Sequence, residues 1–260
     1  FDLNPADFAA DDSPRERGGS PLPDRPRVGE PPISHAPAHR PGPPPKPEDN
    51  TPNKVLGFAL KDLAPAHAYL AERGITVETA TEFGIGFFPA PSGLMVGRIA
   101  IPIHNVEGKV VAYGGRWPGK PPDDGTPKYK LPPGFKKRLE VFNLHRVLRQ
   151  PDEQPFILVE GFFDCVQLWQ HGARRVVSLM GSFLSPEQEA LIIQHTTPRT
   201  HVIVMLDEDD AGREARGEIA ARLALHRFVR VHRFADEGKQ PEHLTAEEVE
   251  ALLSGTGAVP

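Results

Sequence analysis

Residues 201–215, with the sequence HVIVMLDEDDAGREA, place four consecutive acids directly after a run of five apolar residues. The apolar run predicts a buried strand, and the acids begin where that strand should end. Alternate side chains of an extended chain point the same way, so we expect Asp207 and Asp209 to converge. Mg²⁺ prefers oxygen ligands and is usually held by one or two carboxylates together with water and substrate phosphates. The D-x-D spacing therefore predicts a site for Mg²⁺ or Mn²⁺.

A second apolar run, FILVE at residues 156–160, also ends in an acid. We expect Glu160 to complete the metal cluster or to act as an acid or base, with Asp164 one helical turn away. Such a cluster of carboxylates would repel itself and raise some pKa values, and a bound cation removes that conflict. Glu208 and Asp210 have a simpler explanation, because acids stabilise the start of the following helix through its dipole.

The region after Pro155 alternates strand-like and helix-like patterns, and Ser185 followed by Pro186 is a typical helix start. This alternation predicts a parallel sheet with helices on both faces. Ligands of such sheets bind beyond the carboxyl ends of the strands, where Glu160 and Asp207 are expected. The expected strands are 156–160, 175–181, 201–207 and 227–234, and the expected helices are 162–172, 185–195, 211–226 and 244–253.

The preceding region has a different pattern, with a short helix at 63–74 and then strands that read as antiparallel. Residues 105–108 form the turn of a hairpin, and residues 117–134, rich in Pro, Gly and Lys, are expected to be a loop. The expected strands are 85–88, 98–105 and 109–115. A stretch without acids carries the cations Lys128, Lys130, Lys136, Lys137 and Arg138.

The first part of the sequence cannot form a packed core, because fourteen prolines fall within its first 54 residues and its apolar residues follow no period. We therefore expect residues 1–53 to be a disordered, partly extended linker. The sequence begins with Phe rather than Met, so a segment could precede it in the full protein.

Composition excludes several classes of site and protein. Cys165 is the only cysteine, which excludes an intramolecular disulfide and any cysteine-based zinc site in this chain. No apolar run is long enough to span a membrane, so we expect a cytoplasmic protein without a membrane partner. The net charge of -5 argues against a general nucleic-acid coat, but acids and cations occupy separate stretches.

Three motifs in the second half resemble the Toprim domain, which is shared by bacterial primases, type IA and II topoisomerases and some nucleases. They are E-G-x-x-D at 160–164, M-G-S at 180–182 and D-x-D-x-A-G at 207–212. The resemblance implies a metal-dependent site that makes or breaks phosphodiester bonds, with Glu160 as the catalytic glutamate and Asp207 and Asp209 as catalytic metal ligands.

The first half resembles the subdomain that precedes Toprim in the catalytic core of DnaG-type bacterial DNA primases, and topoisomerases lack this block. The resemblance covers about residues 57–243. It implies that Arg116, Lys128 and Lys137, with Arg98 as a weaker candidate, bind nucleic-acid or nucleotide phosphates opposite the acids. The motifs are Y-L-x-x-R-G-I at 69–75, F-x-I-G at 83–86, G-R-I-A-I-P-I at 97–103, G-K-V-V-A-Y-G-G-R at 108–116, P-K-Y at 127–129 and F-x-K at 135–137.

The implied fold is α/β: a Toprim-like, mostly parallel sheet flanked by helices, preceded by a smaller α+β subdomain with antiparallel strands. We expect a basic subdomain at 54–150, a Toprim domain at 151–243 and a terminal helix and tail at 244–260. The implied function is that of a primase, a metal-dependent nucleotidyltransferase that synthesises short RNA primers in DNA replication. Its implied partners are a single-stranded DNA template and ribonucleoside triphosphates, and a replicative helicase is a further partner that the resemblance allows.

One motif departs from this family. Primases of this type carry a further acidic motif resembling G-x-D-P-D, whereas residues 238–242 read G-K-Q-P-E. Gln240 replaces the first acid, and Asp236 or Glu242 could substitute for it. Two alternatives to a primase therefore stay open: a metal-dependent Toprim nuclease, and a degenerate core that binds nucleic acid without catalysis.

Overall fold

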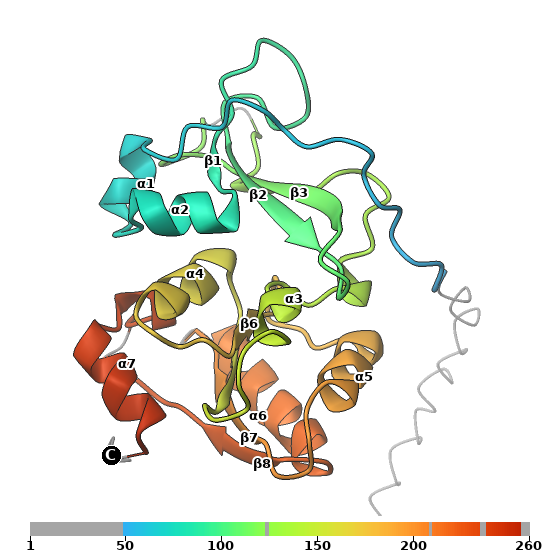
Figure 1. Cartoon of the computed structure of the whole chain (residues 1–260), viewed down its shortest axis with the longest axis vertical. Coiled ribbons are helices and arrows are strands. Elements are labelled where there is room, and N and C mark those ends of the chain that lie inside the picture. The colour runs from blue at the N-terminus through green and yellow to red at the C-terminus, as the bar shows by residue number, and fades with distance from the viewer. Residues whose placement is uncertain (1–48, 123–124, 208–209, 235–237, 256–260) are drawn as a thin grey trace, which may run out of the picture. The chain divides into compact units, whose positions relative to one another are not determined.

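Two sheets position the candidate residues, and Figure 1 shows them with the helices that flank them. Most of the predicted linker, residues 1–48, lies outside the described residues, as do Glu208 and Asp209. The structure is a computed structural model, and it describes residues 49–122, 125–207, 210–234 and 238–255.

The first sheet is antiparallel and has the strand order β1-β2-β3-β4. The expected hairpin joins β2 to β3, and its turn closes where Lys109 donates its backbone N–H to the Asn105 side chain at 2.9 Å. The expected loop at 117–134 contains a short strand, β4, that pairs with the end of β3. The strands are β1 (Gly86–Phe87), β2 (Ile99–His104), β3 (Val110–Arg116) and β4 (Tyr129–Lys130).

Two helices precede this sheet, α1 (Ala68–Glu72) and α2 (Val77–Phe83). The sequence analysis did not anticipate α2, although its ends carry ordinary signals. The Thr76 side chain accepts a hydrogen bond from the backbone N–H of Thr79, and Gly84 ends the helix with a φ of 69°. A left-handed φ of this kind favours glycine, which has no Cβ to clash with the backbone.

The second sheet is parallel and has the order β6-β5-β7-β8. This arrangement, beside an antiparallel first sheet, confirms the expected fold class. Two short helices, η2 (Lys137–Leu139) and α3 (Leu144–Val147), lead from the first sheet into it. The remaining elements are β5 (Phe156–Val159), α4 (Phe162–Gln170), β6 (Val176–Ser178), α5 (Pro186–Gln194), β7 (His201–Met205), α6 (Asp210–Ala224), β8 (Phe228–Val231), η3 (Pro241–His243) and α7 (Ala246–Leu253).

The parallel strands β5, β6 and β7 are buried on both faces, as their apolar sequences require, whereas the edge strand β8 is only partly buried. Ile157 and Ile203 face α4 and α7, whereas Leu158 and Val204 face α5 and α6. Alternate residues of each strand thus contribute to separate clusters, and the helices cover both sides of the sheet. No helix in the described ranges is both long and apolar enough to cross a membrane.

Aromatic side chains join the two sheets into one core. Phe83 of α2 meets the Trp169 ring of α4 edge to face at 5.7 Å, and Phe142 meets Phe162 in the same way at 4.9 Å. The free thiol Cys165 is buried in the same cluster. The first sheet is therefore packed directly against α4, the helix that follows the Glu160 strand.

A histidine pair lies where the β2–β3 hairpin meets α3. The rings of His104 and His145 are 4.2 Å apart, and both are largely buried. Burial lowers the pKa of His104 to about 4, and the neighbouring charges of Arg146 and Arg149 act in the same direction. Burial also lowers the pKa of His145 to about 3, with the same charges and His104 adding to the effect. Both rings are therefore neutral near pH 7.

Candidate active site

The strands that precede Glu160 and Asp207 are neighbours. β5 and β7 pair in parallel, with Val159 opposite Met205, so both chains leave the sheet at the same edge. The structure thus brings Glu160 and Asp207 together at the carboxyl ends of adjacent central strands. This is the edge where parallel α/β sheets bind their ligands. Asp209, the third predicted acid, lies outside the described residues.

The end of β5 is held by the end of β6. The Glu160 carbonyl accepts hydrogen bonds from the Ser178 hydroxyl at 2.7 Å and from the Gly181 N–H at 3.0 Å. The Ser178 hydroxyl in turn accepts from the Met180 N–H at 2.9 Å. The predicted M-G-S motif therefore fixes the backbone from which the half-buried Glu160 side chain extends.

Asp164 is buried in the first turn of α4, and both of its carboxylate oxygens accept hydrogen bonds from backbone N–H groups. The donors are Gly161 at 2.9 Å and Glu242 at 3.3 Å. Burial, together with the negative charges of Asp207 and Glu242, raises the pKa of Asp164 to about 7. Asp164 therefore caps the helix and anchors η3, and its binding of metal stays a prediction.

Asp207 is half-buried and is contacted by the segment that departs from the expected acidic motif. The side-chain amide of Gln240 donates a hydrogen bond to Asp207 Oδ2 at 3.1 Å. A neutral group therefore holds one oxygen of this predicted metal ligand. Glu242, two residues further on, forms an ion pair with Arg73.

The predicted cation Arg116 comes from the first sheet. Arg116, at the end of β3, is buried and donates from Nε to the Tyr69 hydroxyl at 2.9 Å. Its guanidinium also lies 4.9 Å from the centre of the Tyr129 ring. These contacts fix the direction of a charged side chain that the sequence predicted as a phosphate ligand.

Lys128 is exposed, and its pKa depends on neighbouring charges of both signs. Desolvation lowers the pKa of its ammonium, and the positive charges of Arg116 and Arg73 act in the same direction. The negative charges of Glu242 and Asp207 oppose that lowering of the pKa. The charges of the acids and of the neighbouring cations therefore both act on the Lys128 ammonium.

The two other predicted cations have different surroundings. Arg98 is buried, donates to the carbonyl of Pro127 at 2.9 Å and stacks over Trp117. Its described contacts hold the loop that carries Lys128, and phosphate binding by Arg98 stays a prediction. Lys137 donates to the Met180 carbonyl at 3.1 Å, which places its ammonium beside the end of β6.

Gly181 leaves room for that contact. A Cβ at position 181 would lie 2.7 Å from the Lys137 ammonium nitrogen, and the residue has a φ of 156°. The second glycine of the predicted motifs thus admits a cation to the edge on which Glu160 lies.

The sequence analysis did not anticipate the ion pair between Arg73 and Glu242. Arg73 follows α1, forms the ion pair with Glu242 and stacks 5.0 Å from the Phe163 ring. The side-chain amide of Gln167 in α4 also donates to the Arg73 carbonyl. Arg73 belongs to the Y-L-x-x-R-G-I motif, but no local signal shows that it reaches a residue 169 positions away.

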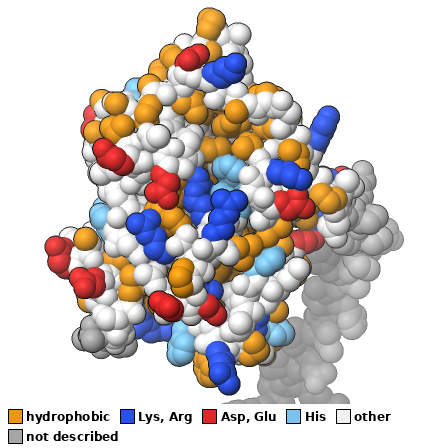
Figure 2. Space-filling view, in the orientation of Figure 1, with side chains coloured by type: hydrophobic (Ala, Val, Ile, Leu, Met, Phe, Trp, Pro, Cys, Tyr) orange, Lys and Arg blue, Asp and Glu red, His pale blue; other side chains and the backbone are white. Residues whose placement is uncertain are grey.

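The donor set is sparse but suited to magnesium. Among residues whose placement is described, no group of three or more His, Cys, Asp or Glu side chains could hold a metal alone. Magnesium needs only one or two carboxylates, and the like charges that raise the Asp164 pKa show an excess of negative charge at this edge. Figure 2 shows Lys and Arg side chains gathered in the middle of one face, so the net charge of -5 is unevenly distributed.

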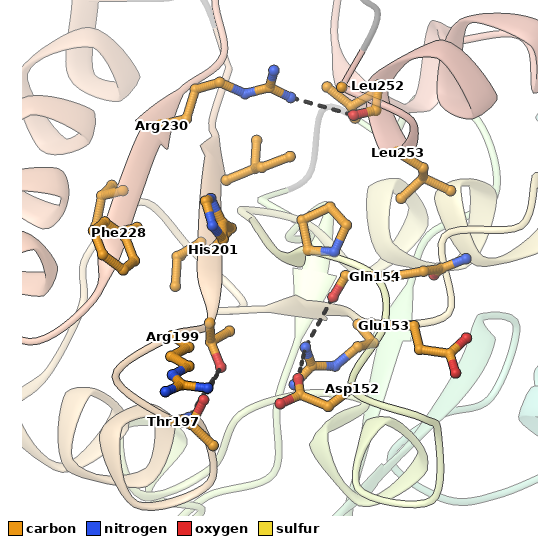
Figure 3. Close-up of a pocket in the computed structure, with 17 residues that line it drawn as sticks. Asp152, Glu153, Gln154, Thr197, Arg199, His201, Phe228, Arg230, Leu252 and Leu253 are labelled. Atoms are coloured by element: carbon orange, nitrogen blue, oxygen red, sulfur yellow. Dashed lines mark hydrogen bonds and ion pairs between the residues drawn. The ribbon is translucent and has the colours of Figure 1, made fainter.

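A cavity of about 600 Å³ lies elsewhere, at the amino ends of the parallel strands. Figure 3 shows it between the starts of β7 and β8 and the end of α7, with His201, Phe228 and Leu252 among its lining residues. Because ligands of parallel sheets bind at the opposite ends of the strands, we do not assign the chemistry to this cavity.

Comparison with known proteins agrees with this geometry. Residues 157–244 match the family described as Toprim-like. The DNA primase of Aquifex aeolicus is 29% identical over 231 residues, which cover 74% of this chain and 45% of that protein. The DNA primase of Enterococcus faecalis is 33% identical over 189 residues, which cover 58% of this chain and 30% of that protein. The chain thus spans less than half the length of these relatives.

Solved structures give the same result. The zinc-binding and RNA polymerase domains of the Aquifex aeolicus primase match with a TM-score of 0.59 and 28% identity, over 71% of this chain and 53% of that one. A DnaG primase catalytic domain bound to single-stranded DNA matches with a TM-score of 0.59 and 26% identity, over 72% and 69%. The chain is therefore similar to the catalytic cores of DnaG-type primases over about 70% of its length, and residues 157–244 match the Toprim-like family.

Proposed function

We propose that this chain is a DNA-directed RNA polymerase of the primase type, which joins ribonucleotides into short primers on single-stranded DNA. The observation that carries the proposal is the meeting of opposite charges at one sheet edge. Asp207 follows β7 of the parallel sheet and Arg116 ends β3 of the antiparallel sheet, yet the charges of both act on the Lys128 ammonium. A site that joins nucleotides needs this pairing, because it must hold both a metal-bound triphosphate and a polyanionic strand.

The acids at the edge fit Mg²⁺ or Mn²⁺. Glu160 and Asp207 supply carboxylate oxygens, and Asp209 follows Asp207 at the spacing that predicts a shared ligand role. When bound, divalent cations stabilise the attacking and leaving oxygens of phosphoryl transfer. Zinc is not part of the proposal, because the chain has only one cysteine and that thiol is buried.

The cations of the first sheet bind and orient phosphates. Arg116 is held by Tyr69 and Tyr129, so its charge is already directed before a ligand arrives. Lys128 is exposed and Lys137 lies beside the M-G-S motif, and both observations support a role for these cations in binding phosphate. Such contacts position a strand without reading its sequence.

The proposed domains correspond to the two sheets. We propose residues 54–150 as the basic subdomain and 151–243 as the Toprim domain, followed by a terminal helix and tail at 244–260. The template is single-stranded DNA, as in one of the solved relatives, and the substrates are ribonucleoside triphosphates. A replicative helicase remains a proposed partner.

A template-dependent synthesis assay tests the proposal. The chain is incubated with single-stranded DNA, labelled ribonucleotides and Mg²⁺ or Mn²⁺, beside Asp207→Ala and Lys128→Ala. We expect labelled primers from the wild type, at least about a hundredfold fewer from Asp207→Ala and an intermediate loss from Lys128→Ala. Lys109→Ala is the matched control, because Lys109 is exposed and pairs only with Glu107 in the described contacts.

Other outcomes identify the alternatives. Shortened DNA in place of labelled RNA indicates a nuclease, and retained DNA binding without either product indicates a non-catalytic core. Equal synthesis by wild type and Asp207→Ala contradicts the assigned site.

A further inference from the structure

The neutral side chain of Gln240 contacts Asp207, a predicted metal ligand. Its amide donates to Asp207 Oδ2 at 3.1 Å, although the two residues are 33 positions apart. An amide supplies a hydrogen bond without charge, whereas a carboxylate at the same position would repel Asp207 and attract a cation. The choice of residue at 240 therefore affects the charge of the site directly.

The segment that carries Gln240 is held from both sides. Its backbone N–H donates to His243 Nδ1 at 3.0 Å, which closes the short helix η3. Lys239 pairs with Glu248 of α7 at 2.6 Å, and Glu242 pairs with Arg73. With both neighbours anchored, the side chain of Gln240 is directed toward the acidic edge by fixed backbone.

The same contacts pair the charged side chains of residues 239–242 with partners of opposite charge. Glu242 is compensated by Arg73, Lys239 by Glu248, and Gln240 is neutral. Among the described residues of this segment, Gln240 therefore orients the Asp207 carboxylate by a hydrogen bond and adds no negative charge beside it.

We propose that Gln240 is a positioning residue that orients Asp207 and, by its neutrality, weakens the binding of divalent cations at this edge. This inference rests on the proposed function, since it takes Asp207 as a metal ligand. It predicts that the chain binds Mn²⁺ less tightly than a variant with a carboxylate at position 240. It also predicts that loss of the amide weakens binding, because Asp207 must then be ordered when the cation arrives.

The test is calorimetric titration of the full chain with Mn²⁺ in the absence of nucleotide and DNA. We expect Gln240→Glu to bind about tenfold more tightly than wild type, because it adds a negative charge a few ångströms from the cation. We expect Gln240→Ala to bind about threefold more weakly. Gln194→Glu is the matched control, because it adds the same charge at an exposed position at the end of α5 and should change nothing.

Thermal unfolding gives a second measurement that is independent of activity and checks folding. Gln240→Glu should unfold at a lower temperature than wild type in EDTA, because its new charge faces Asp207 uncompensated. Saturating Mn²⁺ should raise its unfolding temperature more than that of wild type. A Mn²⁺-induced rise no larger than that of wild type contradicts the proposal.

The titrations separate this inference from the proposed function. Asp207→Asn should abolish Mn²⁺ binding in both the wild-type and Gln240→Glu backgrounds. If Asp207→Asn binds Mn²⁺ like wild type, the metal ligand of the proposed function is wrong. If Asp207→Asn loses binding but Gln240→Glu binds no more tightly than wild type, or Gln240→Ala binds equally well, the role of Gln240 alone is refuted.

Discussion

Replacing Arg73 by Met should destabilise the protein through the ion pair that joins the end of α1 to η3. Arg73 follows α1, whereas its partner Glu242 lies in η3, beside the acidic edge. Methionine retains much of the apolar length of the arginine side chain but removes its charge. Glu242 would then stay negative next to Asp164 and Asp207, whose charges already act on one another.

The magnitude follows from burial. The side chains of Arg73 and Glu242 are 26% and 12% exposed, between the limits of a surface pair and a buried one. Breaking a buried pair costs ~3 to 5 kcal/mol, and a surface pair contributes ~0 to 1 kcal/mol, so we take about 2 kcal/mol here. The stacking of Arg73 on Phe163 adds about 0.5 to 1 kcal/mol. We therefore expect Arg73→Met to lower the free energy of unfolding by about 2 to 3 kcal/mol.

Urea unfolding followed by circular dichroism measures this loss. The double variant Arg73→Met/Glu242→Gln should lose at least about 1 kcal/mol less than the sum of the single variants, because it removes the uncompensated charge. Lys109→Met is the control, since the Lys109–Glu107 pair is about 60% exposed on both sides and should contribute less than about 0.5 kcal/mol. A loss below about 1 kcal/mol for Arg73→Met, or strict additivity in the double variant, refutes the reasoning.

Three further predictions concern the histidine pair, the basic face and the core. His104 and His145 have pKa values in the folded state below the 6.5 of a free imidazole, so the unfolded chain binds more protons as the pH falls below 6.5. The free energy of unfolding should therefore decrease as the pH falls from 6.5 toward 4, by less than about 1.4 kcal/mol per pH unit for each partly screened ring. Urea titrations at several pH values measure this decrease, and the His104→Gln/His145→Gln variant should show a weaker dependence of that free energy on pH. Lys128→Ala should weaken binding to single-stranded DNA and reduce the salt dependence by about one phosphate contact in fluorescence titrations, whereas an unchanged slope would place Lys128 away from the strand. Phe142→Ala removes a fully buried ring and should cost about 3 to 5 kcal/mol in urea unfolding, and a loss under about 1 kcal/mol would contradict the packing.

The sequence predicted the second sheet well because its signals are local. Apolar runs of strand length preceded Glu160 and Asp207, and Ser185 with Pro186 marked the start of α5. The carboxyl ends of parallel strands meet at one edge, so the convergence of the two acids follows from fold class alone. Helix α2 was not predicted, although Thr76 and Gly84 are typical start and end residues, because its mostly polar sequence shows no clear apolar period.

The remaining parts of the site depend on contacts between distant residues. β4 is two residues long and forms only because Tyr129 pairs with Arg116 of β3. Gln240 reads in the sequence as a lost acid, whereas in the fold it contacts Asp207. Arg73 and Glu242 lie far apart in the sequence, and only the fold brings them together as an ion pair. No local propensity encodes such pairs.

The central claim is that one sheet edge binds the catalytic cation, and iron-mediated cleavage tests it most directly. Fe²⁺ replaces Mg²⁺, ascorbate and peroxide generate hydroxyl radicals at the bound metal, and mass spectrometry maps the cut backbone. We predict cuts next to Glu160, Asp207 and Gln240, and their loss in Asp207→Ala. Cuts clustered instead around the cavity at Gln154 and Phe228, or an unchanged pattern in Asp207→Ala, would contradict the account.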